Sequence, residues 1–220
     1  MSTLKEIRRD LKKKGASRED IEIALELMVR ISSLDELVFS KDESCLITLV
    51  PTRKHVYGFP AAYSRANGDE EETYLIFVNG IADFLKKEKS QKKMVITKEK
   101  GRNRLKLVPP TWDGLLVPMA AHEVRHRVQR KLKVKKFSPK AKPFDEVLKW
   151  TIEFYTIEFE ERKKIYIEEG KSQRYIKDRI NPREFDASVI ESFVASRIRG
   201  RNAGKMKEEI ASIIKQERLK

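Results

Sequence analysis

The stretch Met119–Gln129 reads Met-Ala-Ala-His-Glu-Val-Arg-His-Arg-Val-Gln and sets His122 and His126 four positions apart. Residues four apart in an α-helix lie one turn above one another on the same face, so both imidazoles can reach one metal ion. Glu123 follows His122 by about 100° around the helix, where its carboxylate can face the open coordination position of that ion. Two histidine ligands beside a general base are the elements of a site in which zinc activates a water molecule.

The residues around this motif predict a helix that is anchored in the core. Pro118 suits a position in the first turn of this helix, and Thr111 or Asp113 could cap the segment that leads into it. The chain has only three histidines, and two of them stand here at the spacing of metal ligands. The competing interpretation is a helix with two polar histidines and no metal. Apolar side chains recur at helical spacing: Val117, Ala121, Val124, Val128 and Leu132.

The motif resembles that of the zincin metallopeptidases. No histidine follows His126, which excludes the subgroup that completes its site with a third histidine downstream and leaves a carboxylate as the third ligand. The segment Arg183–Ser188, Arg-Glu-Phe-Asp-Ala-Ser, is similar to the E-x-x-A-D or E-x-x-A-N signature of gluzincins. These include the ImmA-like regulator peptidases and the CAAX-processing and HtpX-like membrane proteases. The resemblance implies that Glu184 is the third ligand of a Zn²⁺ cofactor.

The second motif departs from the gluzincin pattern at one position. The acid or amide that orients the first histidine is expected four residues after the ligand, and this chain has Ser188 there; Asp186 or Ser188 could take that role. Glu184 also fits a capping box, because Asn181–Glu184 combines an N-cap, a proline at N1 and a glutamate at N3. If Glu184 only caps the helix, Asp186 or Glu191 is the next choice for the third ligand.

The remaining sequence predicts a single α+β domain over 1–220, and the resemblance implies a zincin-like order of elements. A helical hairpin is expected at 1–40, a sheet region at 41–110, metal-site helices at 111–200 and an amphipathic C-terminal helix at 201–220. In zincin-like folds a small sheet precedes the HExxH helix and the second ligand helix, and its edge strand aligns an extended substrate. Strands are expected at 45–50, 55–59, 73–78, 94–97 and 104–108, with helices at 81–87 and 144–170.

Two further kinds of site residue are candidates. The long insertion between the ligands contains Tyr155 and Tyr175, either of which could donate to a developing oxyanion, although core packing or a surface role is the competing interpretation. Cys45 raises a second possibility, since peptide deformylases combine a cysteine with HExxH. A buried strand cysteine that behaves as a small hydrophobe is the simpler interpretation.

The amino-acid composition indicates which binding partners and which cellular compartment to expect. Charged residues make up 37% of the 220 residues, and the formal net charge is +14, which favours attraction to polyanions. Positive charge gathers at 86–106, 125–142 and 197–207. A single cysteine excludes an internal disulfide framework and suits a reducing compartment. No run of roughly 18 apolar residues and no N-terminal apolar segment is present, so a cytoplasmic protein without a membrane span is expected.

The leading prediction is therefore a zinc metallopeptidase that acts on peptide or protein substrates. The alternative is a basic nucleic-acid-associated regulatory or binding protein with a structural or vestigial metal site. An intermediate possibility is a peptidase acting on nucleic-acid-bound proteins, similar to SprT-like enzymes, although the chain lacks their third histidine.

Overall fold

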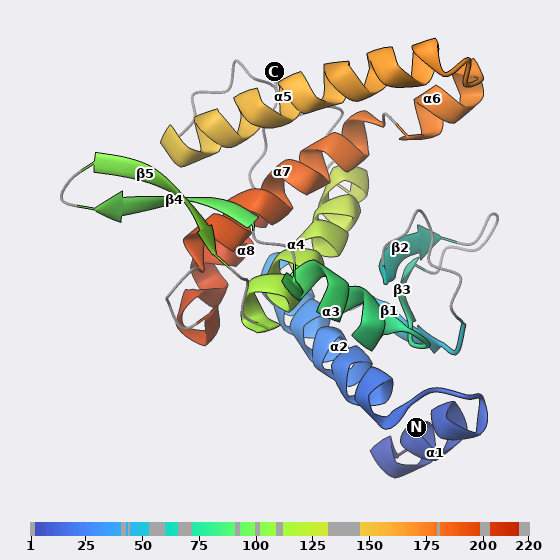
Figure 1. The fold of residues 1–220 in the computed structure, drawn as a ribbon. Coiled ribbons are helices and arrows are strands. Elements are labelled where there is room, and N and C mark those ends of the chain that lie inside the picture. Colours follow the sequence, from blue (N-terminus) through green and yellow to red (C-terminus); the bar gives the residue numbers. More distant parts are fainter. Residues whose placement is uncertain are drawn as a thin grey trace.

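The computed structural model describes residues 3–40, 43, 45–52, 60–65, 72–90, 93–99, 102–108, 112–131, 146–179, 181–198 and 203–215. These residues form a mixed α+β structure that is mostly helical (Figure 1). The helices are α1 (Leu4–Lys13), α2 (Arg18–Phe39), α3 (Ile81–Ser90), α4 (Trp112–Lys131), α5 (Glu146–Glu168), α6 (Gln173–Arg179), α7 (Pro182–Arg197) and α8 (Lys207–Lys215), the last preceded by the 3₁₀ turn η2 (Ala203–Met206). The strands are β1 (Leu46–Val50), β2 (Ala61–Arg65), β3 (Glu72–Phe77), β4 (Lys93–Glu99) and β5 (Arg102–Val108).

The two N-terminal helices are confirmed, and each begins with a capping box. Thr3 and Glu6 exchange hydrogen bonds at the start of α1, and Ser17 and Asp20 do so at the start of α2. These bonds satisfy backbone N–H groups that have no partner within the helix. Gly15 has φ 85°, a backbone conformation that favours glycine, and it ends α1 so that α2 can turn back.

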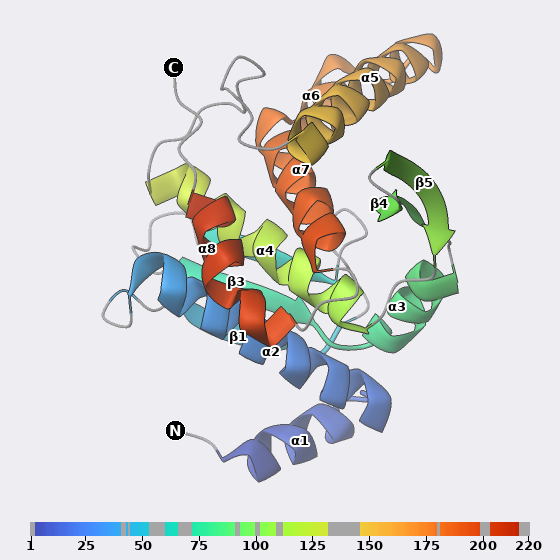
Figure 2. The ribbon, with the colours of Figure 1, turned by 90° about the vertical axis from the view of Figure 1, so that its left-hand side faces the viewer.

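The predicted single sheet is wrong, because the described strands form two sheets. One has the order β1-β3-β2, with β1 parallel and β2 antiparallel to the central β3. The other is the antiparallel pair β4-β5, which Figure 2 shows apart from β1 and β3. Strand β2 was not predicted, because Ala61–Arg65 has no alternation of apolar and polar residues. The predicted strand at 55–59 lies outside the described residues.

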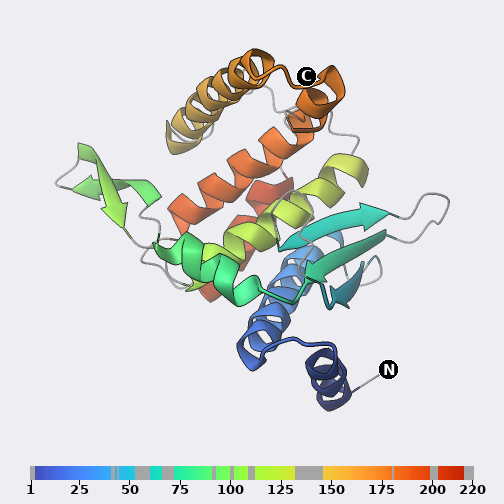
Figure 3. The ribbon, with the colours of Figure 1, turned by 45° about the vertical axis from the view of Figure 1, so that its right-hand side comes forward.

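Helix α4 is the centre of the fold. Every residue from 115 to 125 is buried, and α2, α7, α8 and β2 pack around it (Figure 3). A helix buried on all sides has no solvent face, so its polar side chains must find partners inside the protein. Pro118 lies inside α4 and not in its first turn; the prediction placed the helix start too late, because it treated a proline as a start signal when the apolar run had already begun.

The long helix predicted at 144–170 is confirmed as α5, which packs on α7 and leads into α6. Several apolar side chains of α5 face solvent, namely Ile157, Ile165 and Ile167. Among the helices that the structure describes, none has the length and apolar character needed to cross a membrane.

Candidate metal centre

Helices α4 and α7 bring His122, His126 and Glu184 together. The two Nε2 atoms of the histidines are 3.1 Å apart. One carboxylate oxygen of Glu184 is 3.4 Å from His122 Nε2, and the other is 3.4 Å from His126 Nε2. Zinc–ligand bonds of about 2.0–2.1 Å in tetrahedral geometry place neighbouring ligand atoms roughly 3.3 Å apart, so this group has the dimensions to hold a metal ion.

Gln129 fixes the orientation of the His126 ring. Its amide nitrogen donates to Arg183 O at 2.8 Å and to Asp186 Oδ2 at 2.7 Å, so both N–H groups of the amide have acceptors. The amide oxygen then faces His126 Nδ1 at 3.1 Å. Because that oxygen can only accept, Nδ1 must carry the hydrogen, and the lone pair of Nε2 points toward His122 and Glu184.

Glu191 performs the same task for His122. Its carboxylate lies 3.0 Å from His122 Nδ1, and a carboxylate accepts the Nδ1 hydrogen. When the ring is neutral, the Nε2 lone pair of His122 is therefore also directed into the cluster. Two lone pairs 3.1 Å apart repel unless a proton or a metal cation lies between them, so the arrangement suits a pair of metal ligands.

The charges around the histidines favour a cation at this point. Burial alone would lower the pKa of His122, but the carboxylates of Glu184 and Glu191 raise it well above its ordinary value. Burial would raise the pKa of Glu184, and His122 and His126 together hold it well below its usual range. The same attraction acts on a divalent ion.

Glu184 lies in the first turn of α7, where the sequence also allowed its carboxylate to cap the helix in a capping box. The observed cap is Asn181, whose side chain accepts from Arg183 N at 2.9 Å, and the Glu184 carboxylate turns to the histidines instead. The Glu184 side chain is 39% exposed, compared with 4% for His122 and 15% for His126. The cluster therefore opens to solvent on the Glu184 side.

Glu123 links the cluster to the three-stranded sheet. It is buried, and its Oε2 accepts the backbone N–H of Tyr63 at 2.7 Å. Tyr63 belongs to β2, an edge strand of the described sheet. Burial raises the pKa of Glu123 above its ordinary value, whereas His122 and His126 act in the opposite direction. A buried carboxyl with a raised pKa suits a group that accepts and returns a proton.

The prediction that Asp186 or Ser188 orients the first histidine is not what the geometry shows. Asp186 binds Arg125 through two hydrogen bonds of 2.6 and 3.2 Å, in addition to the Gln129 amide. It thus supports His126 indirectly, through Gln129. The partner of His122 is Glu191, which lies seven residues, two helical turns, after Glu184 on the same face of α7. That spacing, and the position of Gln129 one turn after His126, are the sequence signals for these supporting residues.

Arg125 and Arg127 of the motif are buried. Both belong to the cluster of positive charge that the sequence contains at 125–142. Arg125 is fully buried and donates to Ile214 O of α8 at 2.7 Å, besides its pair with Asp186. Arg127 donates to Asp35, Glu72 and Glu43 O. Neither guanidinium is available to a polyanion, so this part of the expected nucleic-acid surface is lost. Residues 132–142 lie outside the described part.

Two of the remaining candidates, Cys45 and Tyr175, are not part of the group of possible metal ligands. Cys45 precedes β1, and burial raises the pKa of its thiol to about 12. Among the described residues it does not join His122, His126 and Glu184. Tyr175 is exposed, and its ring contacts Tyr166. The side chain of Tyr155 lies outside the described part.

Comparison with protein-family models, with curated proteins and with solved structures yields no match to this chain.

Proposed function

We propose that the protein is a zinc-dependent metallopeptidase of the gluzincin type that hydrolyses bonds in peptide or protein substrates. The observation that carries this proposal is the pair of Nε2 atoms of His122 and His126, both directed as acceptors to one point beside the Glu184 carboxylate. Together with the HExxH motif, this donor set of two imidazoles and a carboxylate is typical of hydrolytic zinc sites.

His122, His126 and Glu184 would hold the zinc ion. When bound, zinc polarises a carbonyl and makes a coordinated water acidic near neutral pH. Glu123 would then accept a proton from the attacking water and return it to the leaving amine. The Tyr63 N–H holds one oxygen of Glu123 in place, so the other oxygen is left for this transfer.

The position of β2 supports a peptide as the substrate class. An extended peptide can add to the edge of a sheet through backbone hydrogen bonds. The bond between Tyr63 N and Glu123 shows that the β2 edge faces the carboxylate assigned to proton transfer. A peptide aligned along β2 would therefore run past the cluster.

The decisive experiment compares the zinc-loaded protein with its Glu123→Gln variant on unfolded protein and peptide-library substrates. We expect hydrolysis by the unchanged chain and a loss of several orders of magnitude in the variant, with zinc content unchanged, because Glu123 is not a ligand. Equal rates in the two proteins would contradict the proposal. Zinc content is measured by elemental analysis in both.

A further inference from the structure

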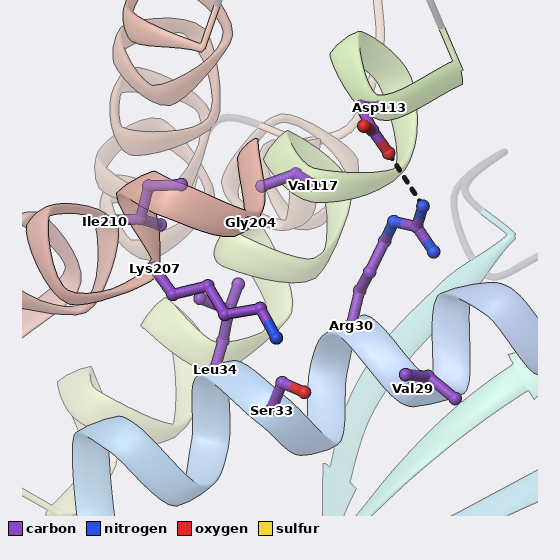
Figure 4. A pocket seen from close by; sticks show the side chains of 9 residues that line it. All are labelled: Val29, Arg30, Ser33, Leu34, Asp113, Val117, Gly204, Lys207 and Ile210. Atoms are coloured by element: carbon purple, nitrogen blue, oxygen red, sulfur yellow. Dashed lines mark hydrogen bonds and ion pairs between the residues drawn. The ribbon is translucent and has the colours of Figure 1, made fainter. Parts of the chain in front are cut away.

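A pocket of about 250 Å³ lies apart from the metal centre, where three segments distant in sequence meet (Figure 4). Helix α2 contributes one wall, the start of α4 a second, and η2 with α8 the third. Nine residues line it: Val29, Arg30, Ser33, Leu34, Asp113, Val117, Gly204, Lys207 and Ile210.

The inner surface of this pocket is apolar. Leu34, Val117 and Ile210 are all buried in the hydrophobic core and present aliphatic side chains to the pocket. Such a surface favours contact with an aliphatic group over water. The pocket thus has an end suited to a hydrocarbon tail.

The polar groups gather on the other side, and two of them have no partner among the described residues. Arg30 is compensated, because it binds Asp113 at 2.7 Å and Glu26 O at 3.2 Å. Lys207 and the Ser33 hydroxyl make no hydrogen bond or ion pair within the described part of the chain. Figure 4 shows Lys207 reaching from α8 across the pocket toward Ser33 on α2. An ammonium group and a hydroxyl that face each other can both donate hydrogen bonds to a bound oxyanion.

We propose that this pocket binds a short aliphatic carboxylate, with the carboxylate between Lys207 and Ser33 and the tail against Leu34, Val117 and Ile210. Arg30 is paired with both Asp113 and Glu26, so Lys207 is the lining cation that is left for a ligand within the described part of the chain, which favours a monoanion. The size limits the ligand too. The pocket is smaller than the roughly 300–1,000 Å³ of sites for drug-sized molecules, which suits a short ligand.

Calorimetric titration with hexanoate, hexylamine and hexanol tests the proposal. We expect saturable binding of hexanoate at millimolar concentration or below, and binding of the amine and the alcohol at least tenfold weaker. The Lys207→Met variant should bind hexanoate at least tenfold more weakly. Lys205→Met is the matched control, since this exposed lysine lies two residues away and does not line the pocket.

A second variant, Ser33→Leu, fills the mouth of the pocket with an apolar side chain and should also weaken binding at least tenfold. Circular dichroism and thermal unfolding establish that each variant is folded. Equal binding of hexanoate and hexylamine, unchanged affinity in Lys207→Met, or no saturable binding of hexanoate would each overturn the proposal. Zinc content should be the same in all variants, so this result is independent of the metal centre.

Discussion

Glu184 and Glu191 contact opposite ends of the same imidazole. Glu184 lies by Nε2 of His122, and Glu191 by Nδ1. We predict that Glu184→Gln loosens zinc far more than Glu191→Gln does, because the first change removes a ligand charge and the second keeps a hydrogen-bond acceptor at Nδ1. Competition with a chromophoric chelator measures both affinities. If Glu191→Gln loses more zinc than Glu184→Gln, Glu191 is the ligand and Glu184 its support.

Gln129 is the residue on which the His126 tautomer depends. Gln129→Leu removes the acceptor for the Nδ1 hydrogen while Asp186 keeps its bond to Arg125. We expect a loss of about 10- to 100-fold in zinc affinity, as is usual when a metal-bound histidine loses its outer partner.

Ser188→Ala is the control for this change. Ser188 lies on α7 but makes no polar contact within the described structure, so its removal should leave the zinc affinity within twofold of the unchanged protein. An equal loss in both variants would show that α7 as a whole, and not the Gln129 amide, supports His126.

At the scale of elements, Asp20 joins α2 to α3. Its carboxylate accepts from Ala82 N at 2.9 Å and from Ser17 at the start of α2. Burial would raise the pKa of Asp20, but the hydrogen bonds from Ala82 and Ser17 outweigh burial and lower it. The folded pKa is thus below the unfolded value of about 3.9, so this stabilisation is present above that value and is lost as pH falls through the folded pKa.

We therefore predict that Asp20→Asn lowers the free energy of unfolding by about 1–2 kcal/mol at pH 7, and by less at pH 3. Urea unfolding at the two pH values measures the difference. Asp10→Asn is the control, since within the described part of the chain the Asp10 side chain forms an exposed pair with Lys14 and no other. A loss that is the same at pH 3 and pH 7 would mean that the charge of Asp20 is not what stabilises the α2–α3 contact.

Helices were predictable from the sequence because their signals are local. Apolar spacing and caps located α1, α2 and α5 to within a few residues, whereas α4 begins six residues before Pro118. The pairing of β1 with β3, the separation of β4-β5 and the position of β2 are contacts between distant segments, which no local pattern specifies. At the metal centre, the HExxH spacing identified two histidines, and Gln129 lies one turn after His126 on the same helix. The contact of Glu191 with His122, by contrast, depends on how α7 packs against α4.

At the scale of the whole molecule, Arg125 joins three helices. From α4 it binds Asp186 of α7 and the carbonyl of Ile214 in α8, and it is fully buried. We predict that Arg125→Met lowers the free energy of unfolding by about 3–5 kcal/mol, because it leaves Asp186 as a buried charge without its partner. Chemical denaturation of the zinc-loaded protein measures this loss.

The double variant Arg125→Met/Asp186→Leu removes both charges and should lose less than the sum of the single variants. Additive losses would show that the two charges are not coupled, and that Arg125 acts mainly through α8.

The long chain segment between His126 and Glu184 affects how readily the helices unfold locally. From His126 to Glu184 the chain advances 184 − 126 = 58 positions, and within that excursion α5 rests on α7 with several isoleucines in solvent. A metal ion that joins the two ends closes this loop, whose length-dependent entropy is about 3–4 kcal/mol. Amide hydrogens of α4 and α7 should therefore exchange with solvent deuterium only in rare, global openings, while those of α5 exchange through smaller local ones. If the proposed ion is bound, a chelator should reduce that difference mainly by speeding exchange in α4 and α7, because these are the helices that the ion would join.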